Sequence, residues 1–200
     1  KLDNITEEDI EDLIVNEELE SKTIEYKSEL PANNYDSRKK FLASVVSFIN
    51  TIGGDQIFGI QEDRSSGKPS SHEGITVPHP DQEVLRLEQM MRNGIEPIPP
   101  SSVYRTKIIQ QQNNNYIFIL RLRRSWLRLH RISLNFKSKF YARATNRKYP
   151  MDIQEIRSSI LLSETVTSQI RQFKEERVSI IDTNESFAPL NIGHLLQKKE

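Results

Sequence analysis

Residues 41–60, FLASVVSFINTIGGDQIFGI, contain the pattern on which the fold of this chain depends. Over the first half, apolar side chains recur at the spacing of one helix face, at Phe41, Leu42, Val45, Val46 and Ile49. Gly53 and Gly54 then end the helix, because glycine takes the positive φ that helix C-termini often need. Residues 55–60 follow as a short buried strand. A helix that leads into a buried strand predicts helices layered on a sheet.

The upstream segment adds a strand and a helix start. Residues 23–30 alternate between apolar and charged side chains, which predicts a half-buried strand with Glu25 and Lys27 on its charged outer face. Asp36 or Ser37 is placed to cap the helix that follows.

The downstream segment continues the alternation of helices and strands. The same signals predict a helix over 81–94, strands over 103–109, 116–122 and 140–144, and a final helical region in two parts over 152–161 and 163–180. The element order predicts an α/β (α+β) fold, a mixed sheet with flanking helices and C-terminal helices. We expect a main domain over 1–160, a C-terminal helix over 161–181, and a loose tail or the start of a further domain over 182–200.

Composition narrows the class of protein. The chain has 200 residues and no cysteine, so it forms no disulfide and has no thiolate metal site. It contains no apolar run of roughly 18 residues, the length that a membrane helix needs. No secretion leader opens it, and we expect a cytoplasmic location and no membrane partner.

The formal net charge of zero conceals a strong segregation of charge. Residues 1–30 carry 3 basic and 11 acidic side chains, whereas residues 101–150 carry 12 basic side chains and no acidic one. The basic segment predicts a polyanionic partner such as nucleic acid. The alternative is a solvated basic sheet face that the acidic N-terminus neutralises.

The basic segment also contains aromatic residues. Arginine and lysine neutralise phosphates, and Trp126 is either a stacking surface for a base or a core anchor. The residues predicted to bind nucleic acid are Arg121, Arg123, Arg124, Trp126, Arg128, Arg131, Lys137, Lys139, Arg143, Arg147 and Lys148.

Carboxylates form a second candidate group. Glu25 and Lys27 share a strand face, and a turn after Glu20 would bring its carboxylate to the same place. Glu62 and Asp63 follow the buried strand, at a strand end where loops commonly build sites. Three converging carboxylates suit a hard divalent cation, which can activate water and stabilise charge on a phosphoryl group. The alternative is ordinary surface charge.

Several motifs taken together resemble one known family. They are Glu20-Ser21, Ile24-Glu25-Tyr26-Lys27, Ser47-Phe48-Ile49-Asn50-Thr51-Ile52-Gly53-Gly54 and Ile57-Phe58-Gly59-Ile60-Gln61-Glu62-Asp63, with Glu96-Pro97, Phe140-Tyr141-Ala142-Arg143 and Tyr149-Pro150-Met151-Asp152 further on. This combination, over about residues 15–160, resembles the Schlafen AlbA_2 domain, the AlbA-like DNA-binding family.

The resemblance implies a mixed α/β fold that binds nucleic acid. Some Schlafen proteins are metal-dependent endoribonucleases that cut tRNA and rRNA through three carboxylates. The resemblance assigns Glu20, Glu25 and Asp63 as ligands of Mg²⁺ or Mn²⁺ and leaves open whether Glu62 replaces Asp63. Lys27 would face the scissile phosphate. The family also implies a homodimer, further domains beyond residue 200, and a role in phage defence.

Two other functions remain open. One is a non-catalytic DNA-binding or regulatory module, which would bind duplex without a metal. The other is a protein-interaction module in which the acidic N-terminus of one copy docks on the basic segment of another.

Overall fold

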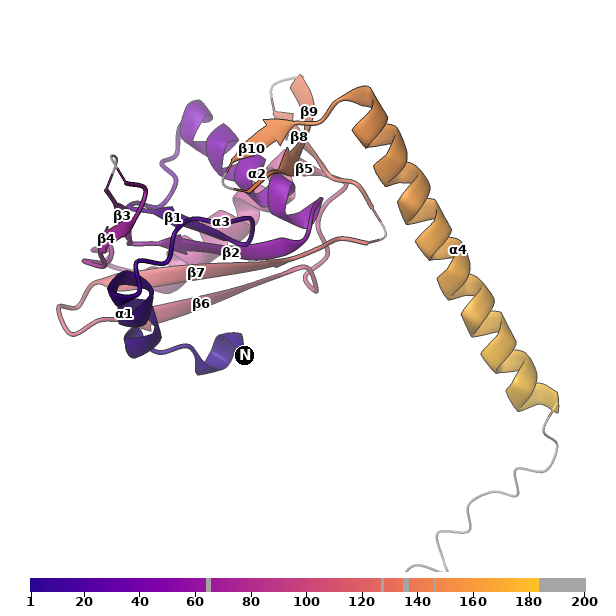
Figure 1. The fold of residues 1–200 in the computed structure, drawn as a ribbon, viewed down its shortest axis with the longest axis horizontal. Helices are drawn as coiled ribbons and strands as arrows, with labels where there is room; N and C mark the ends of the chain where they lie inside the picture. Colours follow the sequence, from indigo (N-terminus) through magenta and orange to yellow (C-terminus); the bar gives the residue numbers. More distant parts are fainter. Residues whose placement is uncertain (64–65, 127, 135–136, 146, 184–200) are drawn as a thin grey trace, which may run out of the picture.

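The computed structural model describes residues 1–63, 66–126, 128–134, 137–145 and 147–183, without the side chains of 137 and 179–183. Helices and strands alternate along the chain (Figure 1). In order they are η1 (Leu2–Asn4), α1 (Glu7–Val15), β1 (Ile24–Lys27), α2 (Tyr35–Ile49), β2 (Gly53–Phe58), β3 (Gln61–Glu62), β4 (Pro69–Ser71), α3 (Pro80–Gly94), β5 (Ile95–Glu96), β6 (Tyr104–Gln110), β7 (Tyr116–Arg123), β8 (Arg131–Leu134), β9 (Lys137–Arg143), β10 (Lys148–Pro150) and α4 (Ile153–Thr183).

Two four-stranded sheets organise the chain. The central sheet has the order β1-β2-β7-β6, with β1 and β2 parallel and the other pairs antiparallel. The second sheet has the order β10-β9-β8-β5 and is antiparallel. A short hairpin pairs β3 with β4. The predicted α/β (α+β) class, a mixed sheet with flanking helices, is confirmed.

Helix α2 lies between the two sheets. Every residue from Phe41 to Ile49 is buried, including Ser44 and Ser47, so this part of the helix is enclosed on all sides. Its core cluster includes residues of α3 and one face of the central sheet. The opposite face packs against η1 and α1, which lie on the other side of the sheet in Figure 1.

Gly53 and Gly54 do not end α2, contrary to the prediction. The helix ends at Asn50, and the two glycines begin β2 with φ values of 80° and 150°. A Cβ at Gly53 would lie 2.5 Å from the Leu122 carbonyl oxygen, and one at Gly54 would lie 2.4 Å from that of Thr23. Glycine is therefore required because β1 and β7 approach β2 from both sides.

Two helix boundaries also differ from the predictions. Asn34, rather than Asp36 or Ser37, caps α2, and its Oδ1 accepts a hydrogen bond from the Ser37 N–H at 2.9 Å. The final helical region is one helix, α4, instead of two parts. Neither glycine nor proline occurs within it, so nothing in its backbone chemistry requires a break.

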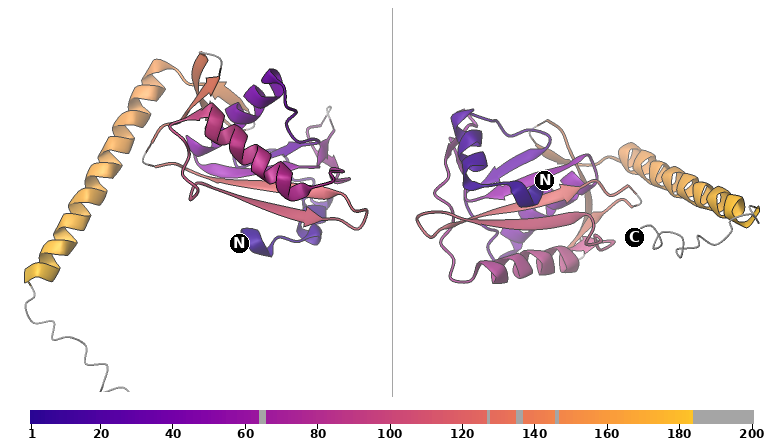
Figure 2. Two further views of the ribbon diagram at one scale, coloured as in Figure 1. Left: turned by 180° about the vertical axis from the view of Figure 1, so that it is seen from behind. Right: turned by 90° about the horizontal axis from the view of Figure 1, so that it is seen from below.

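Helix α4 projects away from the two sheets (Figure 2). Apolar side chains along it, among them Leu161 and Phe173, are exposed. Among the described residues, no helix is both long and apolar enough to cross a membrane. The predicted tail at 182–200 lies outside the described residues from 184 onward, and the domain limits at 160 and 181 stay predictions.

The close approach at Gly54 gives a stability test. We expect Gly54→Ala to lower the free energy of unfolding by about 2 kcal/mol or more, because the new methyl group meets backbone that cannot move aside. Gly67→Ala is the control: its φ is also positive, at 70°, but nothing described lies within 4 Å of a Cβ there. Its cost should be about 1 kcal/mol. Equal urea midpoints for the two variants would contradict the argument.

Candidate functional site

Glu25 is buried, not on an outer face as its place in the alternating strand predicted. It is only 3 % exposed, because Ser44 of α2, Arg143 of β9 and Lys148 of β10 surround its carboxylate. One carboxylate oxygen accepts hydrogen bonds from Arg143 Nη1 at 2.6 Å and from Ser44. The other lies 3.1 Å from Lys27 Nζ and 3.2 Å from Lys148 Nζ. Both oxygens of Glu25 are thus occupied by partners from four elements.

These partners set the charge state of Glu25. Burial alone would raise the pKa of this carboxyl, but the ammonium groups of Lys27 and Lys148, the Ser44 hydroxyl and the Arg143 guanidinium outweigh it. The pKa falls from an ordinary 4.5 to about 2. Glu25 is therefore ionised at every physiological pH.

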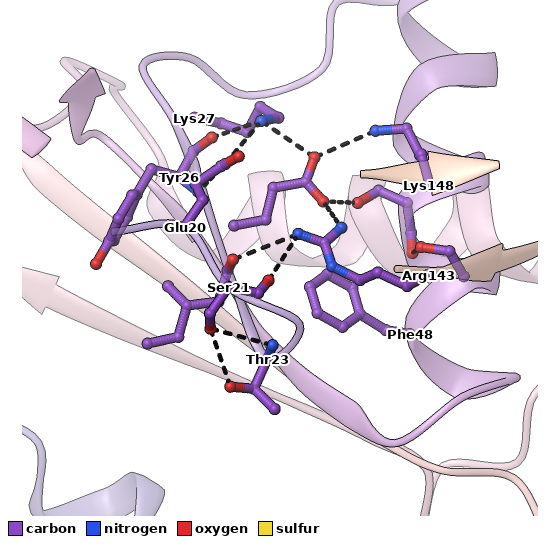
Figure 3. Close-up of polar contacts among 12 residues, drawn as sticks. Glu20, Ser21, Thr23, Tyr26, Lys27, Phe48, Arg143 and Lys148 are labelled. Carbon is purple, nitrogen blue, oxygen red and sulfur yellow. Dashed lines mark hydrogen bonds and ion pairs between the residues drawn. The ribbon is translucent and has the colours of Figure 1, made fainter. Parts of the chain in front are cut away.

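Arg143 is the buried counterpart of Glu25. Its side chain is 1 % exposed, and Nη2 donates to the carbonyl oxygens of Ser21 and Ile24, at 3.3 Å each. The guanidinium carbon lies 4.2 Å from the centroid of the Phe48 ring, which it faces. Arg143 was predicted to bind nucleic acid, yet here it joins β9 to β1 (Figure 3).

Asn50 makes a second link between α2 and the second sheet. Its Nδ2 donates to the His130 and Tyr141 carbonyl oxygens at 2.8 and 3.1 Å, and its Oδ1 accepts from the His130 N–H at 2.9 Å. Asparagine is suited to this position because it can donate and accept at once. The sequence contained Asn50 within the glycine motif, but no local pattern indicated this role.

Glu20 reaches Lys27 through the expected turn. The Ser21 N–H bonds to the Ile24 carbonyl oxygen at 3.1 Å, and the Glu20 carboxylate accepts from the Tyr26 N–H at 2.8 Å. Lys27 Nζ then lies 3.6 Å from Glu20 Oε1 and 3.1 Å from Glu25 Oε1. One ammonium group therefore stands between the two carboxylates, as Figure 3 shows for Glu20 and Lys27.

Glu20, Glu62 and Asp63 line one cleft of about 480 Å³, which we call the acidic cleft. Lys27 and Tyr26 also line it. Asp63 receives a hydrogen bond from Ser66 at 2.7 Å. The chain turn after β2 thus brings both candidates, Glu62 and Asp63, to the side of Glu20.

The surroundings of Glu62 in this cleft disfavour its ionised form. Burial raises the pKa of its carboxyl, and the neighbouring Glu20 raises it further, both as a charge and as a hydrogen-bond partner. Lys27 acts in the opposite direction. Two neighbouring carboxylates, one of them partly buried, form a donor set that suits a hard divalent cation.

The three carboxylates assigned by resemblance are only partly together. Glu20 and Asp63 line the acidic cleft, whereas Glu25 does not. Within the described part of the chain, the one trio of acidic or histidine ligand atoms that all lie within 4.8 Å of one another is elsewhere, at Glu7, Glu11 and His72. Whether Glu25 is a metal ligand stays a prediction.

Comparison with known proteins identifies the family. The family model Schlafen, AlbA_2 matches residues 20–152, about two thirds of the chain. The chain belongs to the Schlafen AlbA_2 family. The match spans the acidic cleft, the Glu25–Arg143 pair and the basic segment, but neither α1 nor α4.

Other comparisons are more distant. A solution NMR structure, the N-terminal domain of a RecG-related protein from Nitrosomonas europaea, is similar at 14 % identity with a TM-score of 0.46. The similarity covers 60 % of this chain and 74 % of that one. No curated protein is similar enough to count as a match.

Most of the residues predicted to bind nucleic acid in this Schlafen AlbA_2 domain fall into two groups. In the first, internal ion pairs occupy the charge: Arg121 with Asp55, Arg131 with Glu96, and Arg143 and Lys148 with Glu25. The second group consists of exposed side chains that form no ion pair with any described residue: Arg123, Arg128, Lys139 and Arg147.

Trp126 belongs to the exposed part of this domain. It is 54 % exposed, which excludes a role as a core anchor. The guanidinium carbon of Arg124 lies 4.0 Å from its ring centroid.

The side chain of Lys137 lies outside the described residues.

The buried pair gives a pH-dependent prediction. We expect Glu25→Gln to lower the free energy of unfolding at pH 7 by about 3 kcal/mol, because Arg143 keeps its charge without a full counter-charge. The folded-state pKa of Glu25 is depressed, so its contribution is complete above the ordinary value of 4.5 and is lost as pH falls toward 2. The difference between wild type and variant in urea titrations should therefore shrink from pH 5 to pH 2.

Glu29→Gln is the control for that titration, since Glu29 is exposed and follows the same strand. It should change the stability by less than about 0.5 kcal/mol at each pH. A Glu25→Gln effect that is small or independent of pH would show that the pair does not hold the fold together.

Proposed function

We propose that this domain binds nucleic acid and cuts RNA in a metal-dependent reaction at the acidic cleft. The observation that carries the proposal is the position of Lys27, which lies beside the carboxylates of the cleft and also contacts Glu25. Metal-dependent phosphodiester cleavage uses acidic ligands for the cation, and a positive group near the phosphate adds stabilisation of the developing charge. Membership of the Schlafen AlbA_2 family supports a nucleic-acid substrate.

Glu20, Glu62 and Asp63 would hold the cation, Mg²⁺ or Mn²⁺. Such a cation polarises a phosphoryl oxygen and lowers the pKa of a water molecule. Glu62 is matched to this task, because its raised pKa shows that its negative charge lacks sufficient compensation in the cleft. A domain that holds carboxylates in this way gains stability when the cation binds.

Lys27 would stabilise the additional negative charge that the phosphate develops during cleavage. Its ammonium group is held at 3.1 Å by Glu25 and at 2.5 Å by the Tyr26 carbonyl oxygen. Glu25 is in turn fixed by Arg143 and Ser44. We therefore assign to Glu25 the positioning of Lys27, although the family resemblance assigns it as a ligand.

The exposed basic residues would hold the strand. Arg123, Arg128, Lys139 and Arg147 are available for phosphate contacts, which position a strand without reading its sequence. Trp126 and Arg124 present a stacked aromatic and cationic surface to a base. A homodimer, a cytoplasmic location and domains beyond residue 200 remain further predictions of the family resemblance.

Cleavage of a fluorescent single-stranded RNA in Mn²⁺ tests the proposal. We expect wild-type protein to cut the strand, and Glu20→Gln and Asp63→Asn to lower the rate at least 100-fold. Glu175→Gln, at an exposed position on α4 that lines neither the acidic cleft nor any neighbouring cavity, should keep the wild-type rate. Intact RNA at every Mn²⁺ and Mg²⁺ concentration, with wild-type protein folded by circular dichroism, would leave the non-catalytic binding module as the function.

Calorimetric titration with Mn²⁺ tests whether Glu62 or Glu25 is the third ligand of the cation. We expect Glu62→Gln to weaken Mn²⁺ binding at least tenfold and Glu25→Gln, where it folds, to weaken it less. The affinity of the wild type should rise with pH across the raised pKa of Glu62, because the proton and the cation compete for this carboxylate. A larger loss in Glu25→Gln would favour the ligand set Glu20, Glu25 and Asp63.

Salt dependence tests the binding surface. With Arg123→Ala and Arg128→Ala combined, we expect weaker binding of every RNA and DNA sequence and a salt slope shallower by about 2. The control pair is Arg121→Ala with Arg131→Ala, whose charges are already paired with Asp55 and Glu96. Equal slopes for the two double variants would place the strand elsewhere on the domain.

A further inference from the structure

A second cavity, of about 270 Å³, adjoins the acidic cleft at Lys27. We call it the lysine pocket. Lys27, Lys40 and Lys148 line it from three different elements, β1, α2 and β10. Lys27 and Ser28 line both cavities, so the two are neighbours.

The charge of the lysine pocket is positive. Three ammonium groups line it, and the one carboxylate among its lining residues is Glu29. Glu25 contacts Lys27 and Lys148, but its negative charge is also compensated by the Arg143 guanidinium, which binds its other carboxylate oxygen. Lys148 contacts Glu25 with one of its three N–H donors, which leaves donors for an anion.

Gln56 provides an independent sign of a ligand. It is 1 % exposed and lines the lysine pocket, and its side-chain oxygen is buried with no hydrogen-bond partner among the described residues. An unpaired buried carbonyl costs about 1 to 3 kcal/mol, so a position that keeps one is a candidate for a donor from outside. Gln56 lies beside Glu25 in the pairing of β1 with β2.

Part of the wall is apolar. Leu30, Phe41 and Phe58 line the lysine pocket, and the two phenylalanine rings pack 6.3 Å apart. A pocket with ammonium groups, an apolar wall and one buried amide suits a ligand with an anionic group, a flat ring and a hydrogen-bond donor. A nucleotide has all three of these features: an anionic phosphate, a flat base and hydrogen-bond donors on the base.

We infer that the lysine pocket binds one nucleotide whose base carries an exocyclic amino group, with its phosphate on Lys27, Lys40 and Lys148 and the amino group on Gln56. Glutamine pairs with adenine in this way, because its oxygen accepts from the amino group while its nitrogen donates to the ring. Read together with the proposed function, on which this part rests, the nucleotide is an unpaired one next to the phosphate that is cut. Single-stranded RNA is commonly recognised through such splayed bases.

Matched ligands test the inference on the metal-free protein. AMP should bind roughly 3- to 10-fold more tightly than purine riboside 5′-monophosphate, which lacks only the amino group. In Gln56→Leu the two ligands should bind equally, while the thermal stability stays the same or rises because the unpaired carbonyl is gone. Undiminished AMP preference in Gln56→Leu would overturn the inference, as would wild-type protein that binds neither ligand.

Lysine variants test the phosphate part. Lys40→Ala should weaken AMP, purine riboside 5′-monophosphate and inorganic phosphate by a similar factor, whereas the adjacent Lys39→Ala should not, because Lys39 does not line the pocket. Equal losses in the two lysine variants would overturn the assignment of the phosphate to this pocket.

Competition experiments separate the sources of the nucleotide. If a short oligoadenylate displaces AMP from wild type, and Gln56→Leu weakens both by a similar factor, the pocket serves an RNA strand. Displacement by AMP alone assigns it to a free nucleotide. The pocket and the proposed function can also fail separately. If AMP binding depends on Gln56 but the protein cuts no RNA, the nucleotide pocket is supported and the proposed function is rejected. If RNA is cut and Gln56→Leu changes neither cleavage nor AMP binding, the proposed function is supported and the nucleotide pocket is rejected.

Discussion

The buried ion pair of Glu25 with Arg143 is the constraint on which this structure depends. Both side chains are nearly inaccessible to water, and a charge in such a place is tolerated only with a partner. The partners come from β1 and β9, which belong to different sheets, and Ser44 of α2 completes the arrangement. The central sheet, the enclosed helix and the second sheet must therefore come together in one register.

This constraint also positions the chemistry. Because Arg143 and Ser44 hold one oxygen of Glu25, the other oxygen is left to Lys27 and Lys148. Lys27 thus stands where the acidic cleft and the lysine pocket adjoin. A negative cleft and a positive pocket therefore lie next to each other, an arrangement that suits the proposed cleavage of a polyanion.

Local patterns in the sequence predicted much of the fold. The apolar spacing of α2 identified the most buried helix, because side-chain periodicity reflects burial directly. The apolar residues of β6 and β7 identified two further strands. The short strands β3, β4, β5, β8 and β10 were missed, since two to four residues are too few for a period to emerge. Because the second sheet was not predicted, nothing in the sequence indicated that Glu25 is buried, and it was predicted to lie on the surface.

The candidate site was only partly predictable for the same reason. Glu20, Lys27 and Asp63 were found because they lie near β1 and β2, whose pattern is clear. Gln56, Lys40 and the pairing of Arg143 with Glu25 depend on contacts between segments far apart in the chain. The net charge of zero likewise concealed two groups of arginines, those paired within the fold and those left at its surface.

A crystal structure of the protein soaked in Mn²⁺, with anomalous scattering recorded at the manganese edge, tests the central claim most directly. The account predicts one strong peak in the acidic cleft, in contact with Glu20, Glu62 and Asp63, and an unchanged pair of Glu25 with Arg143. No peak there, or a peak only at Glu7, Glu11 and His72, would contradict it.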